Sequence, residues 1–327
     1  MPVEPVTDGV LAEARAFNAQ LETTLAGMPS VHTLPPALVR TARRVGKGIF
    51  PAPVVLPELR DLEVPGRGGP IKLRIARPPA GIAPRGVYLH IHGGGWMYGA
   101  ADMQDPYLAA IATAAGVVVA SVEYRLAPEH PFPAGPDDCE DAARWLVTEG
   151  AAALEAPAEF GLGGESAGGH LAALTLIRLR DRGDLARAFT AVSFMFGAFD
   201  LSMTPSQLAW GARNLVLSGP ILAYFGSAFA PGRSLAAMRD PELSPLYADL
   251  RRLPPAHFSC GLVDPLLDDS TFMAARWATA GNRAELRLWP EAVHGFTAFP
   301  IQLAALADAS QCAFLARTLG HRDSANG

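Results

Sequence analysis

The sequence predicts an α/β protein built on a mostly parallel, twisted sheet with helices on both faces. Short, nearly continuous apolar runs of strand length recur from about residue 86 onward, as expected for strands that are buried on both faces. Patterns of helical period lie between several of these runs, and strands that alternate with helices are typical of a layered α/β sheet. The chain has 327 residues and is 50% hydrophobic, which suffices for one large core with a small accessory region.

In the N-terminal part of the chain, the spacing of apolar residues changes from a helical period to the alternation typical of strands. Apolar residues at helical spacing predict short amphipathic helices at residues 10–24 and 36–46, which prolines separate. Alternation of apolar and polar residues then predicts two antiparallel strands, at residues 59–64 and 71–76, joined by a glycine-rich turn.

The remaining strands and helices alternate. The apolar runs that predict buried strands span residues 86–91, 117–122, 160–163, 191–196, 257–261 and 285–288. The helical patterns between and after them span residues 137–149, 167–180, 269–280 and 301–319. Residues 204–239 break the alternation and are too long for a simple connection, so we expect a helical insertion that lies over the strand ends.

Composition excludes several classes of function. The net charge of −5 gives no basic face for nucleic acid or anionic lipid. No apolar window approaches the ~18 residues that a spanning helix needs, and the N-terminus lacks a signal-peptide pattern. Cys139, Cys260 and Cys312 are widely spaced and form no CxxC motif, which argues against a disulfide framework or a structural zinc site. We therefore expect a soluble cytoplasmic protein.

Residues 164–168 read GESAG and fit the pattern G-x-S-x-G of a nucleophile elbow. A predicted strand ends just before this segment, and a predicted helix begins at about Ala167. A sharp strand-to-helix turn leaves room only for small residues two positions either side of the serine, where Gly164 and Gly168 stand. The turn would expose the Ser166 hydroxyl at a helix N-terminus, which favours developing negative charge.

Residues 92–95 read HGGG and directly follow another predicted strand, which is the second signal of this type of site. Acyl transfer passes through an oxyanion that backbone N–H groups must approach closely, and glycines permit that approach. We expect the oxyanion donors to come from Gly93, Gly94 and Gly95 together with Ala167. The alternative of a metal site at the HxH pair of residues 90–92 lacks a third ligand at a useful spacing.

The base and the orienting acid must follow the nucleophile in the order Ser, acid, His. The histidines that follow Ser166 are His170, His257, His294 and His321. His294 lies in a glycine-containing loop after a predicted strand, where a general base should project, whereas the other three suit packing or a polar tail. Asp264, just beyond the strand at 257–261, is the expected acid. Asp268 and Asp269 are rivals that look more like a cap for the next helix.

These motifs resemble those of the hormone-sensitive-lipase-like branch of α/β hydrolases, the bacterial family IV esterases. The resemblance rests on HGGGW at 92–96, YRLAPEHPFPA at 124–134, GESAGG at 164–169, and the DPL and HGF segments that contain Asp264 and His294. It implies an eight-stranded α/β-hydrolase fold and hydrolysis of short-to-medium acyl esters through an acyl-enzyme intermediate, without a cofactor or metal. Dimerisation through a sheet edge is frequent in similar proteins, so a homodimer is one expectation.

The resemblance also implies a division of the chain and shows two departures. Residues 1–50 and 204–239 would form a helical cap over a catalytic domain of residues 51–203 and 240–327. The family usually has Asp before the nucleophile and before the YRLAPE block, whereas this chain has Glu165 and Glu123. The longer side chains affect the expected support of the loops more than the reaction.

The substrate pocket and the rival functions are less defined by sequence. Trp96, Tyr98, Trp210 and Phe225 are candidate pocket residues, although aromatics at helical spacing are also typical of cap core. A lactonase or amidase on the same triad, or a non-catalytic small-molecule receptor on this scaffold, remain alternatives. A dinucleotide-binding loop is disfavoured because Ser166 takes the third glycine position of G-x-G-x-x-G.

Overall fold

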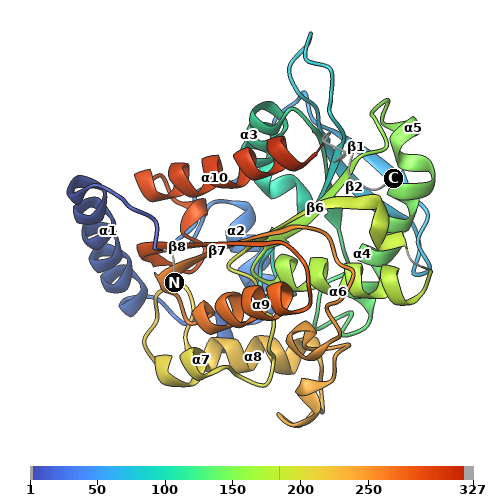
Figure 1. The fold of residues 1–327 in the computed structure, drawn as a ribbon. Coiled ribbons are helices and arrows are strands. Elements are labelled where there is room, and N and C mark those ends of the chain that lie inside the picture. Colours follow the sequence, from blue (N-terminus) through green and yellow to red (C-terminus); the bar gives the residue numbers. More distant parts are fainter. Residues whose placement is uncertain (1–2, 184, 320–327) are drawn as a thin grey trace.

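A twisted sheet runs through the centre of the molecule (Figure 1). The computed structural model describes residues 3–183 and 185–319, and within them eight strands lie in the order β1-β2-β4-β3-β5-β6-β7-β8. The strands are β1 (Arg60–Val64), β2 (Ile71–Ala76), β3 (Val87–Ile91), β4 (Val118–Glu123), β5 (Phe160–Glu165), β6 (Phe189–Met195), β7 (Ala256–Val263) and β8 (Ala284–Val293). Pairs β1–β2 and β2–β4 are antiparallel and the others are parallel, which confirms the predicted fold class.

Helices cover both faces of this sheet. They are α1 (Asp8–Ala26), α2 (Pro36–Arg44), α3 (Asp105–Ala115), α4 (Ala134–Trp145), α5 (Ala151–Ala153), α6 (Ala167–Asp181), α7 (Pro205–Trp210), α8 (Gly219–Phe229), α9 (Leu267–Thr279) and α10 (Gln302–Thr318). Helices α3 and α10 lie on one face, whereas α4, α6 and α9 lie on the other, with α7 and α8 beyond α9 (Figure 1).

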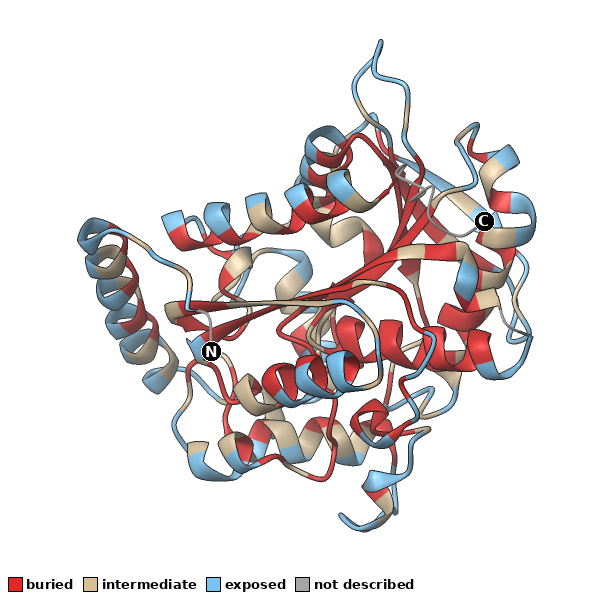
Figure 2. Cartoon of the chain, viewed as in Figure 1, coloured by how far each residue is buried: buried red, intermediate tan, exposed pale blue. Residues whose placement is uncertain are grey.

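The core lies along the sheet and around α6. Figure 2 shows the strands buried and the outward faces of the surrounding helices exposed. Every residue of α6 from Ala167 to Arg180 is buried, so this helix is enclosed on all sides. Among the described residues, no helix combines the length and the apolar character needed to cross a bilayer.

Helix α3 is the main element that the sequence analysis missed. Its sequence is rich in alanine, and its apolar positions show no clear stripe. The signals that mark it are at its ends, because Pro106 lies in the first turn and Gly116 closes it at φ 66° in the left-handed region. Proline near the start and glycine just past the end are typical of helices.

The N-terminal segment and the insertion contact each other. Arg213 of the insertion donates to Glu22 of α1 across 2.9 Å, and α8 contacts the short 3₁₀ turn Val31–Thr33. The N-terminal segment also covers part of the β8 edge, where Glu4 donates its N–H to the Leu288 carbonyl at 2.8 Å. Segments from the two ends of the chain thus lie side by side.

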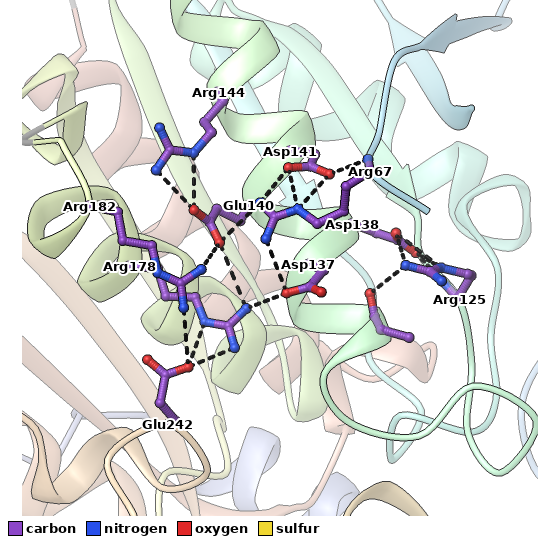
Figure 3. A network of polar contacts seen from close by, with 11 residues as sticks. Arg67, Arg125, Asp137, Asp138, Glu140, Asp141, Arg144, Arg178, Arg182 and Glu242 are labelled. Atoms are coloured by element: carbon purple, nitrogen blue, oxygen red, sulfur yellow. Dashed lines mark hydrogen bonds and ion pairs between the residues drawn. The ribbon is translucent and has the colours of Figure 1, made fainter. Parts of the chain in front are cut away.

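An ion-pair network fastens α4 to its surroundings (Figure 3). Glu140 of α4 is almost fully buried and accepts hydrogen bonds from Arg144 and Arg182, both at 2.9 Å. Arg178 of α6 reaches Asp137 of α4 at 3.0 Å and Glu242 at 2.7 Å. The network therefore joins α4, α6 and the loop that carries Glu242.

The Glu140→Gln substitution should destabilise the fold. It removes a buried charge that several arginines share, so Arg144 and Arg182 lose the carboxylate they bind and the buried Arg178 loses one of its three carboxylate neighbours. We expect the free energy of unfolding to fall by about 2–3 kcal/mol, as measured by urea denaturation. Glu149→Gln, at an exposed position just beyond α4, is the matched control and should change stability little. Equal stability of the two variants would contradict a structural role for the network.

Candidate active site

Ser166 occupies a sharp turn between β5 and α6. Its backbone has φ 55° and ψ −118°, a conformation that residues other than glycine rarely adopt. A Cβ atom on Gly164 or Gly168 would collide with the carbonyl oxygen of Ile91 at the end of β3. Glycine at these two positions therefore lets β3, β5 and the start of α6 approach closely, as expected from the sequence.

Ser166, His294 and Asp264 form a continuous chain of hydrogen bonds. His294 Nε2 lies 2.9 Å from Ser166 Oγ, and His294 Nδ1 lies 3.0 Å from Asp264 Oδ2. The Leu266 N–H donates to Asp264 Oδ1 at 2.8 Å and fixes the carboxylate. The aspartate and the histidine side chains are buried, whereas Ser166 is half-buried. The arrangement can transfer a proton from the serine hydroxyl to the imidazole.

The sheet explains why these three residues meet. Strands β5, β7 and β8 end just before Ser166, Asp264 and His294, respectively. Because β5 to β8 are parallel, their carboxyl ends lie at the same edge of the sheet. Strand β8 runs to Val293, five residues further than the sequence predicted, and so carries His294 to that edge.

The glycine loop lies directly beside the turn. A Cβ atom on Gly93 would lie 3.4 Å from the Ser166 Cβ. Gly94 and Gly95 have φ 118° and 62°, and the Gly94 carbonyl accepts from the Tyr98 N–H at 2.9 Å. In the described part of the chain, the N–H groups of Gly94 and Gly95 find no acceptor. The Ala167 N–H belongs to the first turn of α6 and has no partner within the helix.

The side chains of His92 and Tyr124 hold the start of the glycine loop. The Tyr124 hydroxyl donates to the His92 carbonyl at 2.9 Å, and the two rings stack with centroids 4.3 Å apart. His92 Nδ1 lies 2.8 Å from the Gly93 carbonyl and must donate to it, because a carbonyl only accepts. His92 therefore supports the loop.

His170 holds the far end of the loop, a role that sequence reasoning missed. The Trp96 indole N–H donates to His170 Nδ1 at 3.1 Å, and His170 Nε2 lies 2.7 Å from the Leu243 carbonyl, to which it donates. The imidazole is thus neutral, with one donor and one acceptor nitrogen. Burial lowers the pKa of His170 to about 4, although the bond to Leu243 opposes the shift.

Glu165 and Glu123, which stand where the family usually has Asp, each form a hydrogen bond within the protein. Glu165 lies 2.8 Å from His90 Nε2, while His90 Nδ1 lies 2.8 Å from the Ser121 hydroxyl. Burial would raise the pKa of Glu165, but its electrostatic interaction with His90 and hydrogen bonds from His90, Tyr107 and Gln104 outweigh burial, so the net pKa is lowered. Glu123 accepts the Ala101 N–H at 2.7 Å.

His90 is therefore engaged by Glu165 and Ser121, and His92 by its own loop. Within residues 3–183 and 185–319, no group of three or more His, Cys, Asp or Glu side chains could hold a metal ion. His257 is buried beside Ser193 and Ser310, and His321 lies outside the described residues.

The expectation that Asp268 and Asp269 cap their own helix is wrong. Both lie in the first turn of α9, but their carboxylates bind the segment 199–207, where the insertion begins, instead. Asp269 accepts the N–H groups of Phe199 and Asp200 at 2.7 and 2.9 Å, and Asp268 accepts the Ser206 N–H at 2.7 Å. Sequence showed the favourable position near a helix start but not the more distant donors that use it.

Three of the four candidate pocket residues gather at the glycine loop. The Phe225 ring lies so close to Gly95 that a Cβ atom there would meet it, and the Tyr98 ring is 5.8 Å from that of Phe225. Trp96 is buried and stacks on Phe229 with centroids 4.7 Å apart. Trp210 donates its indole N–H within the insertion, to the carbonyls of Arg213 and Leu217.

Comparisons with known proteins agree with this architecture. The sequence pattern of the α/β-hydrolase-fold family matches residues 88–298. Carboxylesterase NlhH of Mycobacterium tuberculosis is 37% identical over 278 residues, which cover 83% of this chain and 86% of NlhH. Esterase LipI of the same organism is 32% identical over 299 residues, 90% of this chain and 92% of LipI.

Solved structures extend the similarity over nearly the whole chain. A hyperthermophilic esterase from the archaeon Pyrobaculum calidifontis superposes with a TM-score of 0.83 at 29% identity, covering 98% of this chain and 100% of its own. An ester hydrolase from the metagenome of Lake Arreo, solved with a bipyridine phosphonate derivative, gives 0.84 at 30% identity over 95% of this chain and 100% of its own. This chain belongs to the α/β-hydrolase-fold family, in the hormone-sensitive-lipase-like branch that its motifs predicted.

The buried neutral His170 predicts a specific loss of stability in acid. The pKa of His170 is lowered in the folded protein. At mildly acidic pH the imidazole is therefore protonated in the unfolded chain and neutral in the folded protein. Stability from this group is present above pH ~6.5 and declines as the pH falls towards 4. Between pH 7 and 5 this loss should amount to about 2 kcal/mol.

His170→Gln should remove this part of the pH dependence, even though the variant is less stable throughout. Denaturation curves of both proteins at pH 8, 7, 6 and 5 measure the difference. The two proteins should differ by a constant amount between pH 8 and 7, and the gap should narrow below pH 6.5. A gap that stays constant down to pH 5 would show that His170 is not held neutral.

Proposed function

We propose that this protein is a serine carboxylesterase that hydrolyses short-to-medium acyl esters through an acyl-enzyme intermediate. The observation that carries the proposal is the bond from Ser166 Oγ to His294 Nε2 at 2.9 Å, with Asp264 on the other imidazole nitrogen at 3.0 Å. The names of the relatives NlhH and LipI, a carboxylesterase and an esterase, support the same reaction class.

In the first half-reaction, Ser166 Oγ attacks the ester carbonyl carbon while its proton passes to His294 Nε2. Asp264 orients the imidazole and stabilises its positive charge. The carbonyl oxygen becomes an oxyanion, and the tetrahedral intermediate collapses when the C–O bond to the alcohol breaks. His294 donates its proton to the departing alcohol oxygen, which leaves the acyl group on Ser166.

The second half-reaction repeats these steps with water. His294 takes a proton from the water as its oxygen attacks the acyl carbon, and a second oxyanion forms. Its collapse breaks the bond to Ser166 Oγ, which regains the proton, and the carboxylic acid departs. In both halves the N–H groups of the Gly93–Gly95 loop and of Ala167 stabilise the oxyanion, and removing one such donor costs about 10²–10³-fold in rate.

The N-terminal residues 1–50 and the insertion 204–239 form the cap in this proposal, over a catalytic domain of residues 51–203 and 240–327. Their direct contact and the position of Phe225 on the glycine loop support this division. Phe225 of the cap would line the acyl pocket together with Trp96 and Tyr98 of the catalytic domain, and Trp210 is a further candidate from the cap. We keep the cytoplasmic location and a homodimer as predictions.

Ser166→Ala should reduce kcat for chromogenic acyl esters by at least ~10³-fold while the protein stays folded. An acyl series from acetate to decanoate, assayed with both proteins, tests the reaction and its chain-length range together. Ser227→Ala, at an exposed position on α8, is the matched control and should retain full turnover. Near-normal activity of the Ser166→Ala variant would overturn the proposal.

The alternatives give different results in the same assays. A lactonase or amidase on this triad would turn over lactones or aryl amides faster than esters and lose that activity in Ser166→Ala. A non-catalytic receptor would bind small esters without turnover in either protein.

A further inference from the structure

Helix α2 carries three arginines near its C-terminal end, and two of them have carboxylate partners. Arg40 pairs with Glu129 at 2.8 Å and also donates to the Met97 carbonyl. Arg44 pairs with Asp102 at 2.8 Å. The Arg43 side chain makes no hydrogen bond or ion pair with any of the described residues. A guanidinium has five N–H donors, so this cation is left without the acceptors that its neighbours have.

Arg43 lies between two aromatic rings, those of Phe50 and Tyr98. Its guanidinium carbon is 4.9 Å from the centroid of each ring. The Phe50 ring lies 4.0 Å from where a Cβ atom on Gly295 would stand, and Gly295 follows His294. Tyr98 closes the turn of the glycine loop, since its N–H donates to the Gly94 carbonyl. The cation thus lies between the residue next to the base and the loop of the proposed oxyanion site.

A buried hydroxyl, that of Tyr98, lies on one of the two residues that stack on Arg43. The Tyr98 hydroxyl is fully buried and has no well-formed hydrogen bond to a described residue. Burial and, after it, the charge and side-chain hydrogen bond of Tyr224 raise the pKa of Tyr98, so its hydroxyl stays protonated. Arg43 itself is half-buried, and none of its nitrogens is fully occluded. Donors that lack acceptors and can still be reached are typical of a binding site for an anion.

We propose that Arg43 binds a carboxylate carried by the ester substrate, so that the preferred substrates are anionic esters such as half-esters of dicarboxylic acids or esters of hydroxy acids. This proposal rests on the proposed function, because it assigns the substrate class of the same site. A guanidinium binds a carboxylate through two parallel hydrogen bonds. Burial lowers the pKa of Arg43 to about 10, which keeps the group charged at neutral pH.

A role confined to packing is the competing explanation. A cation in the last turn of a helix is favoured by the helix dipole, and stacking between two rings stabilises a guanidinium. Such a role would affect anionic and neutral esters equally. The ratio of kcat/KM for an anionic ester to that for its neutral isostere therefore separates the two explanations.

The test compares monoethyl succinate, glutarate and adipate with the ethyl esters of the corresponding monoamides, which have the same shape without the charge. A second pair, 4-acetoxybutanoate and 4-acetoxybutanamide, places the charge on the alcohol part. The wild type should prefer the anionic member of at least one pair. Arg43→Gln should lower that anionic-to-neutral ratio by about 10- to 100-fold, and Arg43→Lys should lower it less.

Arg44→Gln is the matched control, because Arg44 is the next residue of α2 and already has a carboxylate partner. Its ratio should equal that of the wild type. The wild-type preference should also weaken as salt is raised from 0.02 to 0.5 M, since salt screens charge pairs. An unchanged ratio in Arg43→Gln, or an equal fall in Arg44→Gln, would overturn the proposal.

A binding measurement separates failure of this inference from failure of the proposed reaction. In a Ser166→Ala background, titration calorimetry with monoethyl glutarate should show tighter binding than with its monoamide ester, and Arg43→Gln should abolish the difference. Turnover of neutral esters without any anionic preference would support the esterase and reject the role of Arg43. A carboxylate-dependent affinity that needs Arg43, without turnover in the wild type, would support the anion site and reject the esterase.

Discussion

The close approach of three backbone segments at the end of β5 determines the geometry of the site. The Ile91 carbonyl occupies the space that a side chain on Gly164 or Gly168 would need, so the start of α6 lies directly against β3. The chain can turn this sharply only because Ser166 adopts a positive φ, and this conformation strains the backbone at the residue that carries the hydroxyl. Because the glycine loop continues from β3, the same approach brings the loop beside Ser166.

Buried hydrogen bonds on both sides of the turn then hold the approach in place. Glu165, the residue before the serine, binds His90, and the Trp96–His170 bond secures the end of the glycine loop. His170 in turn binds the Leu243 carbonyl, and the neighbouring Glu242 is held by Arg178 in the network of Figure 3. A buried polar network stabilises the fold only when each of its groups has a hydrogen-bond partner. Through the neighbouring residues Glu242 and Leu243, the ion pairs around α4 are connected to the loop of the proposed oxyanion site.

Much of this arrangement could be predicted from sequence, because it is local. Ser166 and His294 are marked by glycines, by the strands before them and by their order, and parallel strands bring such positions to one edge. The contacts of Asp269, His170 and Arg43 were not predictable in the same way. Each depends on a partner far along the chain, or on the lack of one, which only the folded structure defines. Helix α3 was missed because its alanine-rich sequence has no clear apolar stripe, although its proline and glycine ends marked it.

The central claim is that Ser166 is the residue that His294 activates for attack. The most direct measurement is the reaction of the folded protein with a fluorophosphonate, in which the serine oxygen bonds to phosphorus and fluoride leaves, followed by peptide mass spectrometry. We expect one adduct per chain on Ser166, a much slower reaction in His294→Ala, and none after unfolding in urea. A modified residue other than Ser166, or an equal rate without His294, would contradict the account.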